Sequence, residues 1–426
     1  MNSSPLVRYG LVAALALAPI GLRLATWRSH RPQNVDVAMA QEGEKLFVHE
    51  WKPNDPLANG GDGLGPVFNA KSCVACHFQG GAGGSGGLEH NVLVFTVQPV
   101  STTDVPREGV VHAGAFPASF QEKLSQVNIN LPNTSMVQLG DLIPVPNCGR
   151  HPMRFPQGIH LSHRNTPALF GANLIDAIPD RVIIAQERTQ WLKLGMASPD
   201  REDVPVGRAL RLANGRVGHF GWKAQSDSLL EFVQAACANE LGLSNPGHPQ
   251  PSPIGYPSYE GRGPDLTLDQ CEQLSAYIAS LPRPVERTPD NLKSAEMAHA
   301  GKALFTRIGC AECHTPNLGE VEGLYSDLLL HQMGELLVGG GSYGEPPLLL
   351  PKFKPAEGPV SSEWRTPPLW GVADSAPYMH DGRAKTLEEA IRFHGGQGLR
   401  SAQSFTQLGL EEQSQLVTFL KVLRAP

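Results

Sequence analysis

Two short clusters of cysteine and histidine are the residues of this chain best suited to chemistry. Each has two cysteines separated by two residues and followed at once by histidine: Cys73-Val74-Ala75-Cys76-His77 and Cys310-Ala311-Glu312-Cys313-His314. Composition alone predicts roughly 0.004 occurrences of this pattern, so finding two of them is informative. Two thiols on one short turn can form thioethers with the vinyl groups of haem, and the adjacent imidazole can bind the iron. The spacing predicts two covalently attached c-type haems, with His77 and His314 as iron ligands.

Zinc knuckles and thiol redox motifs also use paired cysteines, and the sequence disfavours both. A zinc site needs further ligands nearby. Neither kind of site requires histidine directly after the second cysteine. Haem attachment is the interpretation that uses all three residues of each cluster.

The elements around the two motifs form an internal duplication. A matching five-residue segment precedes each motif, a proline-containing loop and a second glycine-containing loop follow it, and two predicted helices close each copy. The matching segments are 43–47 with 301–305, 164–171 with 365–371, 220–224 with 380–384, and 268–281 with 410–423. In this alignment Trp222 falls opposite Asp381-Gly382. The proline-rich residues 282–289 separate the copies, which indicates a mainly α chain with domains at 41–285 and 286–426.

Residues 78–163 are extra in the first copy. They begin with a glycine-rich run at 80–87, and residues 92–97 have the composition of a short β-strand. We expect a small β-containing insertion, which is either an ordinary loop insertion or a cover over the first haem.

Residues 1–40 resemble an export signal or an N-terminal anchor. Arg8 and Arg23 flank an apolar run that is short for a membrane span and is interrupted by Pro19. Residues 38–40 offer a small-x-small cleavage site, and an uncleaved anchor or a buried first helix are the alternatives. We expect the chain to be periplasmic or in the cell envelope.

Composition narrows the possible functions of the 426-residue chain. Its net charge is -6 and only 18% of its residues are charged, with no block of like charges, so we expect no nucleic-acid partner. The 45 glycines and 37 prolines indicate long loops. Three cysteines lie outside the motifs. Cys237 and Cys271 are a candidate disulfide pair, buried free thiols are the alternative, and Cys148 is left over.

A predicted helix at 386–394 supplies a candidate sixth ligand for the second iron. Thr386 and Glu389 have the spacing of a capping box, and Gly395 is a suitable stop. The apolar stripe of this helix continues to His394, so this side chain should face the core. We expect His314 and His394 to bind one iron from opposite sides, with Met379 and His380 as alternatives to His394.

The matching helix of the first copy presents Ala236 where the second presents His394. Its capping residues, Ser228 and Glu231, have the same spacing. The first iron therefore has His77 and an open opposite side, where peroxide or dioxygen could bind. A histidine from the insertion could still close this site; the candidates are His90, His112, His151, His160 and His163.

Four more side chains have candidate roles. Trp222 is the candidate aromatic bridge between the haems, and a simply packed tryptophan is its alternative. Glu240 lies one helical turn beyond Ala236 and is the candidate acid–base catalyst at the open side. Arg164 and Arg365 are expected to bind haem propionates or to serve structure, since guanidinium groups suit carboxylates.

These motifs resemble those of the di-haem oxidoreductase family, which is also labelled peroxidase-like or thiol-oxidoreductase-like. The resemblance spans roughly residues 40–425 and includes, besides the haem motifs, segments 61–69, 220–224, 363–370 and 380–384. More distantly the chain resembles bacterial di-haem cytochrome c peroxidases. The resemblance implies two cytochrome c-like helical haem domains in tandem.

The resemblance also implies one haem for chemistry and one for electron entry. It favours hydrogen peroxide reduction at the N-terminal haem, with electrons from a small cytochrome c or a cupredoxin. His394 stands where the peroxidases have methionine, which puts a high-potential entry role in doubt. A pure electron-transfer cytochrome and an oxygenase or protein-maturing oxidoreductase are the alternatives. Relatives carry a calcium ion between domains, but the sequence shows no compact calcium-ligand motif.

Overall fold

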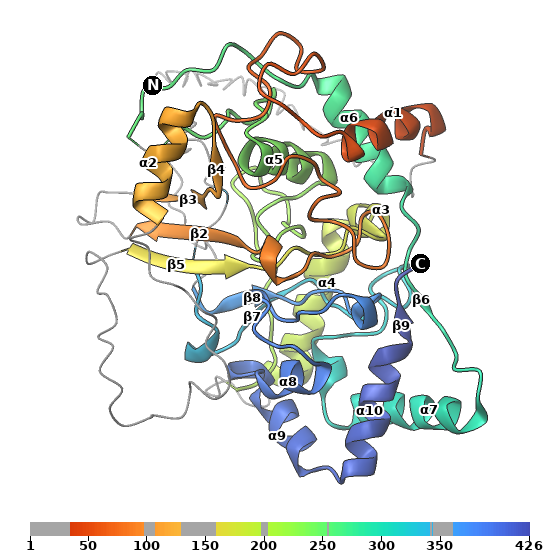
Figure 1. The fold of residues 1–426 in the computed structure, drawn as a ribbon. Helices are drawn as coiled ribbons and strands as arrows, with labels where there is room; N and C mark the ends of the chain where they lie inside the picture. The colour runs from red at the N-terminus through yellow and green to blue at the C-terminus, as the bar shows by residue number, and fades with distance from the viewer. Residues whose placement is uncertain are drawn as a thin grey trace, which may run out of the picture.

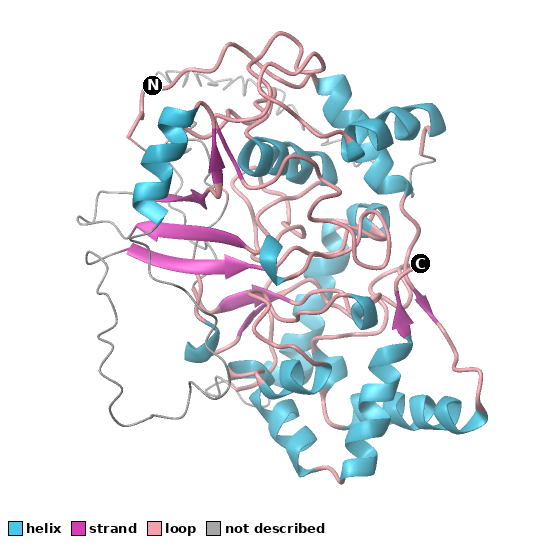
Figure 2. Ribbon diagram, viewed as in Figure 1, coloured by secondary structure: helices cyan, strands magenta, loops and turns pink. Residues whose placement is uncertain are grey.

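The computed structural model describes residues 35–97, 107–128, 159–196, 203–253, 255–340, 343 and 361–426. The described chain is mostly helical with small antiparallel sheets, and its helices gather at two ends with the strands between them (Figures 1 and 2). Residues 1–34, Cys148 and His151 lie outside the described residues, as does the side chain of His160. No helix among the described residues is long and apolar enough to cross a membrane.

The helices and strands have the following bounds. The helices are α1 (Val37–Val48), α2 (Ala118–Asn128), α3 (Ala172–Asp176), α4 (Asp180–Gln190), α5 (Leu229–Leu241), α6 (Leu268–Ser280), α7 (Leu292–Arg307), α8 (Leu387–Arg392), α9 (Leu399–Gln407) and α10 (Leu410–Val422). The strand pairs are β1 (Val67–Phe68) with β4 (Gly114–Ala115), β6 (Val285–Glu286) with β9 (Leu423–Arg424), and β7 (Leu330–Gln332) with β8 (Glu363–Arg365). A three-stranded sheet has β2 (Val92–Val97) between β3 (Arg107–Val111) and β5 (Ile159–Arg164).

The duplication is visible in two helix crossings that each depend on a glycine. α1 packs against α6 at Gly43, where a methyl group would overlap the Gln273 carbonyl oxygen. α7 packs against α10 at Gly301, where a methyl group would overlap the Gln415 carbonyl oxygen. Only glycine allows the backbones to approach this closely. Gly43 and Gly301, which occupy matching positions in the two copies, therefore allow the same close packing of two helices in each copy.

Two hydrophobic cores surround these crossings. The first contains the fully buried Phe47 and much of α5 and α6, and the second contains Phe305 and Phe419, whose rings lie 5.4 Å apart. The first core also takes in Leu324 and Trp370 from the second half of the chain. The two halves are thus packed into one another, even though each has its own helix pair.

Helix α4 of the N-terminal half also contacts the C-terminal half. It runs from the N-terminal half toward the C-terminal half (Figure 1), and Gln190 at its end donates a hydrogen bond to the Glu312 carbonyl at 2.7 Å. Lys193, just beyond the helix, forms an ion pair with the Glu312 side chain at 2.9 Å. The N-terminal half therefore contacts the second cysteine motif directly.

Two matching hairpin turns correct the sequence alignment of the copies. Phe220 pairs with Ser226, and Tyr378 pairs with Ala384, in the same backbone arrangement. In this register Trp222 corresponds to His380, so its alignment with Asp381-Gly382 is wrong. Gly171 in the first copy and Gly371 in the second have nearly the same positive φ, 72° and 73°. Aligning these two glycines places Asn165, rather than Arg164, opposite Arg365.

These corresponding residues are hydrogen-bonded across the two halves. The Asn165 N–H donates to the His380 carbonyl at 2.7 Å, and the Arg365 N–H donates to the Trp222 carbonyl at 3.0 Å. Each half therefore supplies the donor of one bond and the acceptor of the other.

Several local predictions are confirmed and one is not. The predicted strand is β2, and the two closing helices are α6 and α10. Cys237 and Cys271 are buried free thiols, so the expected disulfide is wrong. The predicted cleavage site falls inside α1, whose N-cap, Asp36, accepts hydrogen bonds from the first turn. Cleavage there would remove this cap.

Candidate haem sites

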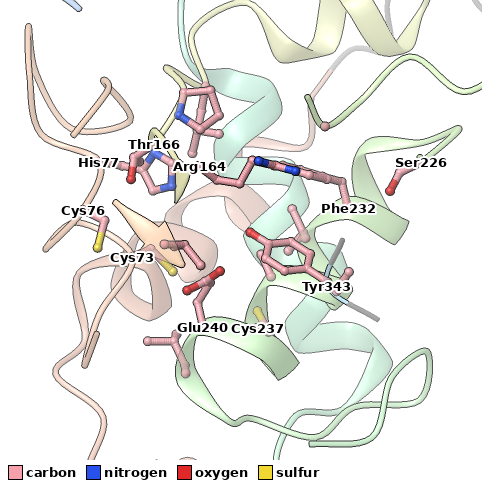
Figure 3. A pocket seen from close by; sticks show the side chains of 18 of the residues that line it. Cys73, Cys76, His77, Arg164, Thr166, Ser226, Phe232, Cys237, Glu240 and Tyr343 are labelled. Atoms are coloured by element: carbon pink, nitrogen blue, oxygen red, sulfur yellow. The ribbon is translucent and has the colours of Figure 1, made fainter. Parts of the chain in front are cut away.

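The first cysteine motif lines one side of a cavity. Cys73, Cys76 and His77 all line it (Figure 3). The lining is predominantly apolar. His77 donates from Nδ1 to the Gly84 carbonyl at 3.1 Å, and the Pro167 carbonyl also contacts its ring. Hydrogen bonds of this kind are typical of histidines that bind metals. Burial lowers the pKa of His77 to about 4, so its ring is neutral at neutral pH, as metal binding requires.

Helix α5 forms the opposite side of this cavity and presents Ala236 and Glu240 to it. The Asn69 amide donates to the Glu240 carboxylate at 2.7 Å, and Tyr343 interacts with the same carboxyl group. Burial raises the pKa of Glu240 to about 7, against these two hydrogen-bonding partners, which lower it. Figure 3 shows the Glu240 carboxyl below the Tyr343 hydroxyl, with His77 in the same pocket. A carboxyl group with a pKa near neutrality can both give and take a proton.

The insertion histidines expected as possible ligands do not line this cavity where their side chains are described. His90 lies 3.6 Å from the Cys76 sulfur, and buried His112 donates to the Asn239 carbonyl at 2.9 Å. His163 is likewise absent from the lining. His248 does line it, but its Nε2 is 3.4 Å from Glu231. Among the described residues, His77 is the imidazole best placed to bind an iron here.

The second motif lines another cavity, in which two imidazoles face each other. Cys310, Cys313, His314 and His394 all line it. The Nδ1 atoms of the histidines donate to the carbonyls of Tyr325, at 3.0 Å, and Ala390, at 2.8 Å. Both rings therefore keep Nε2 free, and burial lowers the pKa of each histidine below its ordinary value.

The spacing of these two rings fits a metal held between them. Their centroids are 6.3 Å apart. Two metal–nitrogen bonds of about 2 Å each, with the two half-rings added, give a separation of roughly 6 Å. The donor set, the apolar cavities and the paired cysteines thus fit one haem in each pocket. Thr386 caps α8 as predicted, accepting from the Glu389 N–H. The helix ends at Arg392, so His394 lies two residues beyond it and not within it as expected.

The two alternatives to His394 also line the second cavity. His380 stacks on Trp364, with ring centroids 3.6 Å apart, and its carbonyl holds Asn165. Met379 has a positive φ of 72°. Since His394 already faces His314 at metal-binding distance, the geometry favours His394.

Trp222 lines both cavities. Its indole N–H donates to the Asn165 carbonyl at 2.9 Å, which fixes the ring at the boundary of the two halves. Arg164 lines the first cavity and Arg365 the second. Burial lowers the pKa of each guanidinium to about 10, so both remain cationic at neutral pH and can bind carboxylates.

Sequence reasoning missed two groups beside the cavities. Tyr343 lies far from Glu240 in sequence and belongs to no periodic segment. His331, together with Asp327, contacts Cys313 from β7 and the loop before it. A signal was available only for His331, because both motifs are followed by a histidine within 20 residues of the second cysteine.

Comparison with known proteins places these pockets in context. The family model described as "Di-haem oxidoreductase, putative peroxidase" matches residues 153–423. Hydrazine synthase subunit gamma of Kuenenia stuttgartiensis is 26% identical over 195 residues, covering 39% of this chain and 52% of that protein, about half its length. The methylamine utilization protein MauG of Methylorubrum extorquens is 27% identical over 258 residues, covering 56% of this chain and 68% of MauG.

Solved structures show weaker similarity. The di-haem peroxidase BthA of Burkholderia thailandensis matches with a TM-score of 0.40 and 14% identity, covering 91% of this chain and 86% of that chain. Hydrazine synthase of Kuenenia stuttgartiensis gives a TM-score of 0.41 and 16% identity, covering 99% and 100%. The family match therefore rests on sequence.

Proposed function

The chain belongs to the di-haem oxidoreductase family, and from this premise we propose that it is an exported c-type cytochrome that reduces hydrogen peroxide at its first pocket. Haem would be joined to Cys73 and Cys76 in that pocket and to Cys310 and Cys313 in the second. Bound haem supplies one-electron redox chemistry and, where a coordination position is open, a place for peroxide.

The asymmetry of the two pockets carries this proposal. In the second pocket His394 faces His314 at 6.3 Å, whereas α5 presents Ala236 to the first pocket at the corresponding position. A methyl group cannot bind a metal, so α5 offers no ligand to the first pocket, and the Tyr343 side chain that also lines it is hydrogen-bonded to Glu240. We propose that peroxide binds on this side. The second pocket, with imidazoles on both sides, is suited to passing electrons.

The residues around the first pocket have the chemistry that peroxide reduction needs. Hydrogen peroxide takes up two electrons and two protons to give two molecules of water. Glu240 holds a proton on its carboxyl group up to about pH 7 and can supply it from the α5 side. Trp222, which borders both cavities, is positioned to pass electrons from the second pocket to the first. We propose that a small cytochrome or cupredoxin delivers these electrons.

Electron paramagnetic resonance of the air-oxidised protein tests the asymmetry. We expect one high-spin and one low-spin ferric signal, and loss of the low-spin signal in His394→Ala. Met379→Leu is the matched control, because Met379 lines the same cavity and should leave the low-spin signal in place. Peroxide consumption with a reduced small cytochrome then tests the reaction.

Two low-spin signals in the wild type would contradict the open first pocket. If peroxide consumption were also absent, the protein would be an electron carrier. If the high-spin signal were present without peroxide consumption, an oxygenase or protein-oxidising reaction at the same pocket would become the better account.

A further inference from the structure

A buried ion pair lies beside Cys313, one of the two cysteines that line the second cavity. His331 and Asp327 are 2% and 0% exposed, and His331 Nε2 lies 2.8 Å from the Asp327 carboxylate. The other ring nitrogen, Nδ1, lies 3.5 Å from the Cys313 sulfur. In the haem-loaded protein this sulfur would be the thioether through which the second haem is attached.

The hydrogen bonds around His331 determine its charge. Asp327 accepts from the Gln190 amide at 2.7 Å and from the Leu329 N–H at 2.9 Å, so it is an ionised carboxylate surrounded by donors. His331 Nε2 must therefore donate to it. On the other side of the ring, Nδ1 lies 2.8 Å from Gln397 Oε1. Gln397 donates its own amide to the Val206 carbonyl at 3.1 Å, which fixes its oxygen toward the ring. Both ring nitrogens face acceptors, so His331 is an imidazolium.

The pair has a fixed orientation relative to the haem motif. His331 lines the second cavity and lies 3.5 Å from the Cys313 sulfur, whereas Asp327 does not line the cavity and its carboxylate lies within 4.8 Å of that sulfur. Gln190 holds Asp327 in place while it also donates to the Glu312 carbonyl at 2.7 Å and accepts from the Gly207 N–H at 2.9 Å. The positively charged member of the pair is therefore the one that lines the second cavity, and Gln190 of α4, from the other half of the chain, holds the arrangement in place.

Among the residues that the structure describes, the first pocket has no equivalent buried pair. His90 stands 3.6 Å from the Cys76 sulfur, but its side chain is 29% exposed and its nearest carboxylate is Glu89, at 3.6 Å and itself 67% exposed. Water screens charges at such a position, whereas a buried charge acts over a longer range. The second cysteine motif therefore has a buried charged histidine beside it, whereas the histidine beside the first motif is partly exposed to solvent.

We propose that the His331–Asp327 pair tunes the reduction potential of the second haem. Its charges raise this potential above the value that two histidine ligands alone would give. A positive charge near a haem favours the reduced state, which carries one positive charge fewer. Bis-histidine ligation gives lower potentials than histidine–methionine ligation, so the pair offsets part of that difference. The inference rests on the proposed function only in requiring a haem at Cys310 and Cys313.

The alternative of a metal ion among Cys313, Asp327 and His331 is disfavoured. Their ligand atoms lie within 4.8 Å of one another. However, both nitrogens of His331 already point at hydrogen-bond acceptors, and a thioether sulfur is a poor partner for a cation that binds carboxylates.

Redox titration of the full-length haem-loaded protein, monitored by electron paramagnetic resonance, tests the proposal. In His331→Gln the Asp327 charge remains without its partner, so the second haem should show the lowest potential. In the double variant Asp327→Asn/His331→Gln both charges are gone, so its potential should lie between those of His331→Gln and the wild type. The potential of the first haem should not change in either variant.

His90→Gln is the matched control, since it makes the same substitution beside the other motif. It should leave the potential of the second haem unchanged. If His331→Gln does not fold, because it leaves a buried carboxylate unpaired, the double variant still decides the question against the wild type.

Equal second-haem potentials in the wild type and the double variant would overturn the inference, as would a rise in either variant or an equal shift in His90→Gln. Haem content and mass, measured on the same samples, keep this failure distinct from failure of the proposed function. A chain with two haems and an unmoved potential contradicts only the inference, whereas a chain without haem at Cys310 and Cys313 contradicts the proposed function.

Discussion

Glu240→Gln is the substitution that most directly tests the chemistry assigned to the first pocket. Burial raises the pKa of this carboxyl group from 4.5 to about 7. If Glu240 supplies a proton, peroxide turnover should fall as pH rises through about 7, by roughly tenfold for each further unit. The glutamine variant should lose this dependence and turn over about 10²- to 10⁴-fold more slowly, which is the usual contribution of general acid–base catalysis.

The same pKa shift has a consequence for stability. Because the folded state holds this proton more tightly than the unfolded state, the folded state binds more protons between about pH 4.5 and pH 7. Stability should therefore be lost as pH rises through that window, by up to about 3 kcal/mol in total. Glu240→Gln removes this loss, so the variant should be more stable than the wild type at pH values above about 7.

Steady-state peroxide consumption and urea unfolding, each measured between about pH 5 and pH 9, check both effects. Asn69→Ala is a useful companion, because it removes the amide that donates to Glu240 and lowers its pKa, and should move the kinetic break to higher pH. A wild-type rate that is flat across pH 7, or a glutamine variant with the same break as the wild type, would refute the role assigned to Glu240.

Three further predictions follow from the fold. Trp222→Phe should slow peroxide turnover while leaving both ferric signals intact, and should do so more than Trp370→Phe, since Trp370 lines only the second cavity; equal effects would remove the case for a bridge. Gly301→Ala should lower the free energy of unfolding by about 1–3 kcal/mol, measured in urea, because its methyl group meets the α10 backbone; an unchanged midpoint would mean that the crossing adjusts freely. Cys237 and Cys271 should react with a thiol reagent only after unfolding, and failure to react without a reductant would show a disulfide.

Local patterns predicted the elements that carry the second pocket. The apolar stripe of α8 and its Thr386 cap depend on residues close in sequence, so the sequence alone could place His394 on the core side, although α8 ends at Arg392, two residues before it. The same reasoning placed Ala236 and Glu240 on one face of α5, where both line the first cavity. Helical periodicity is a short-range property, and for that reason it can be seen in a single chain.

The groups that the sequence did not reveal depend on contacts between distant segments. His331 acquires its charge from Asp327, Gln397 and Gln190, and the last of these comes from the other half of the chain. The alignment of Trp222 with His380 emerged only from the matching hairpin hydrogen bonds, because the two loops share few residue types. Tertiary structure decides such positions, and one-dimensional spacing does not record it.

The exchanged hydrogen bonds at the boundary of the halves have a symmetry that bears on the origin of the chain. Asn165 and Arg365 are corresponding donors, and His380 and Trp222 are corresponding acceptors, so each bond is the counterpart of the other. This is the contact pattern of an isologous dimer, in which one surface meets a second copy of itself. A shorter polypeptide with a single copy would satisfy the same donors and acceptors by dimerising, and joining two such genes end to end would make that dimer permanent. The joined copies would then be free to diverge, as they have at the matching positions Ala236 and His394.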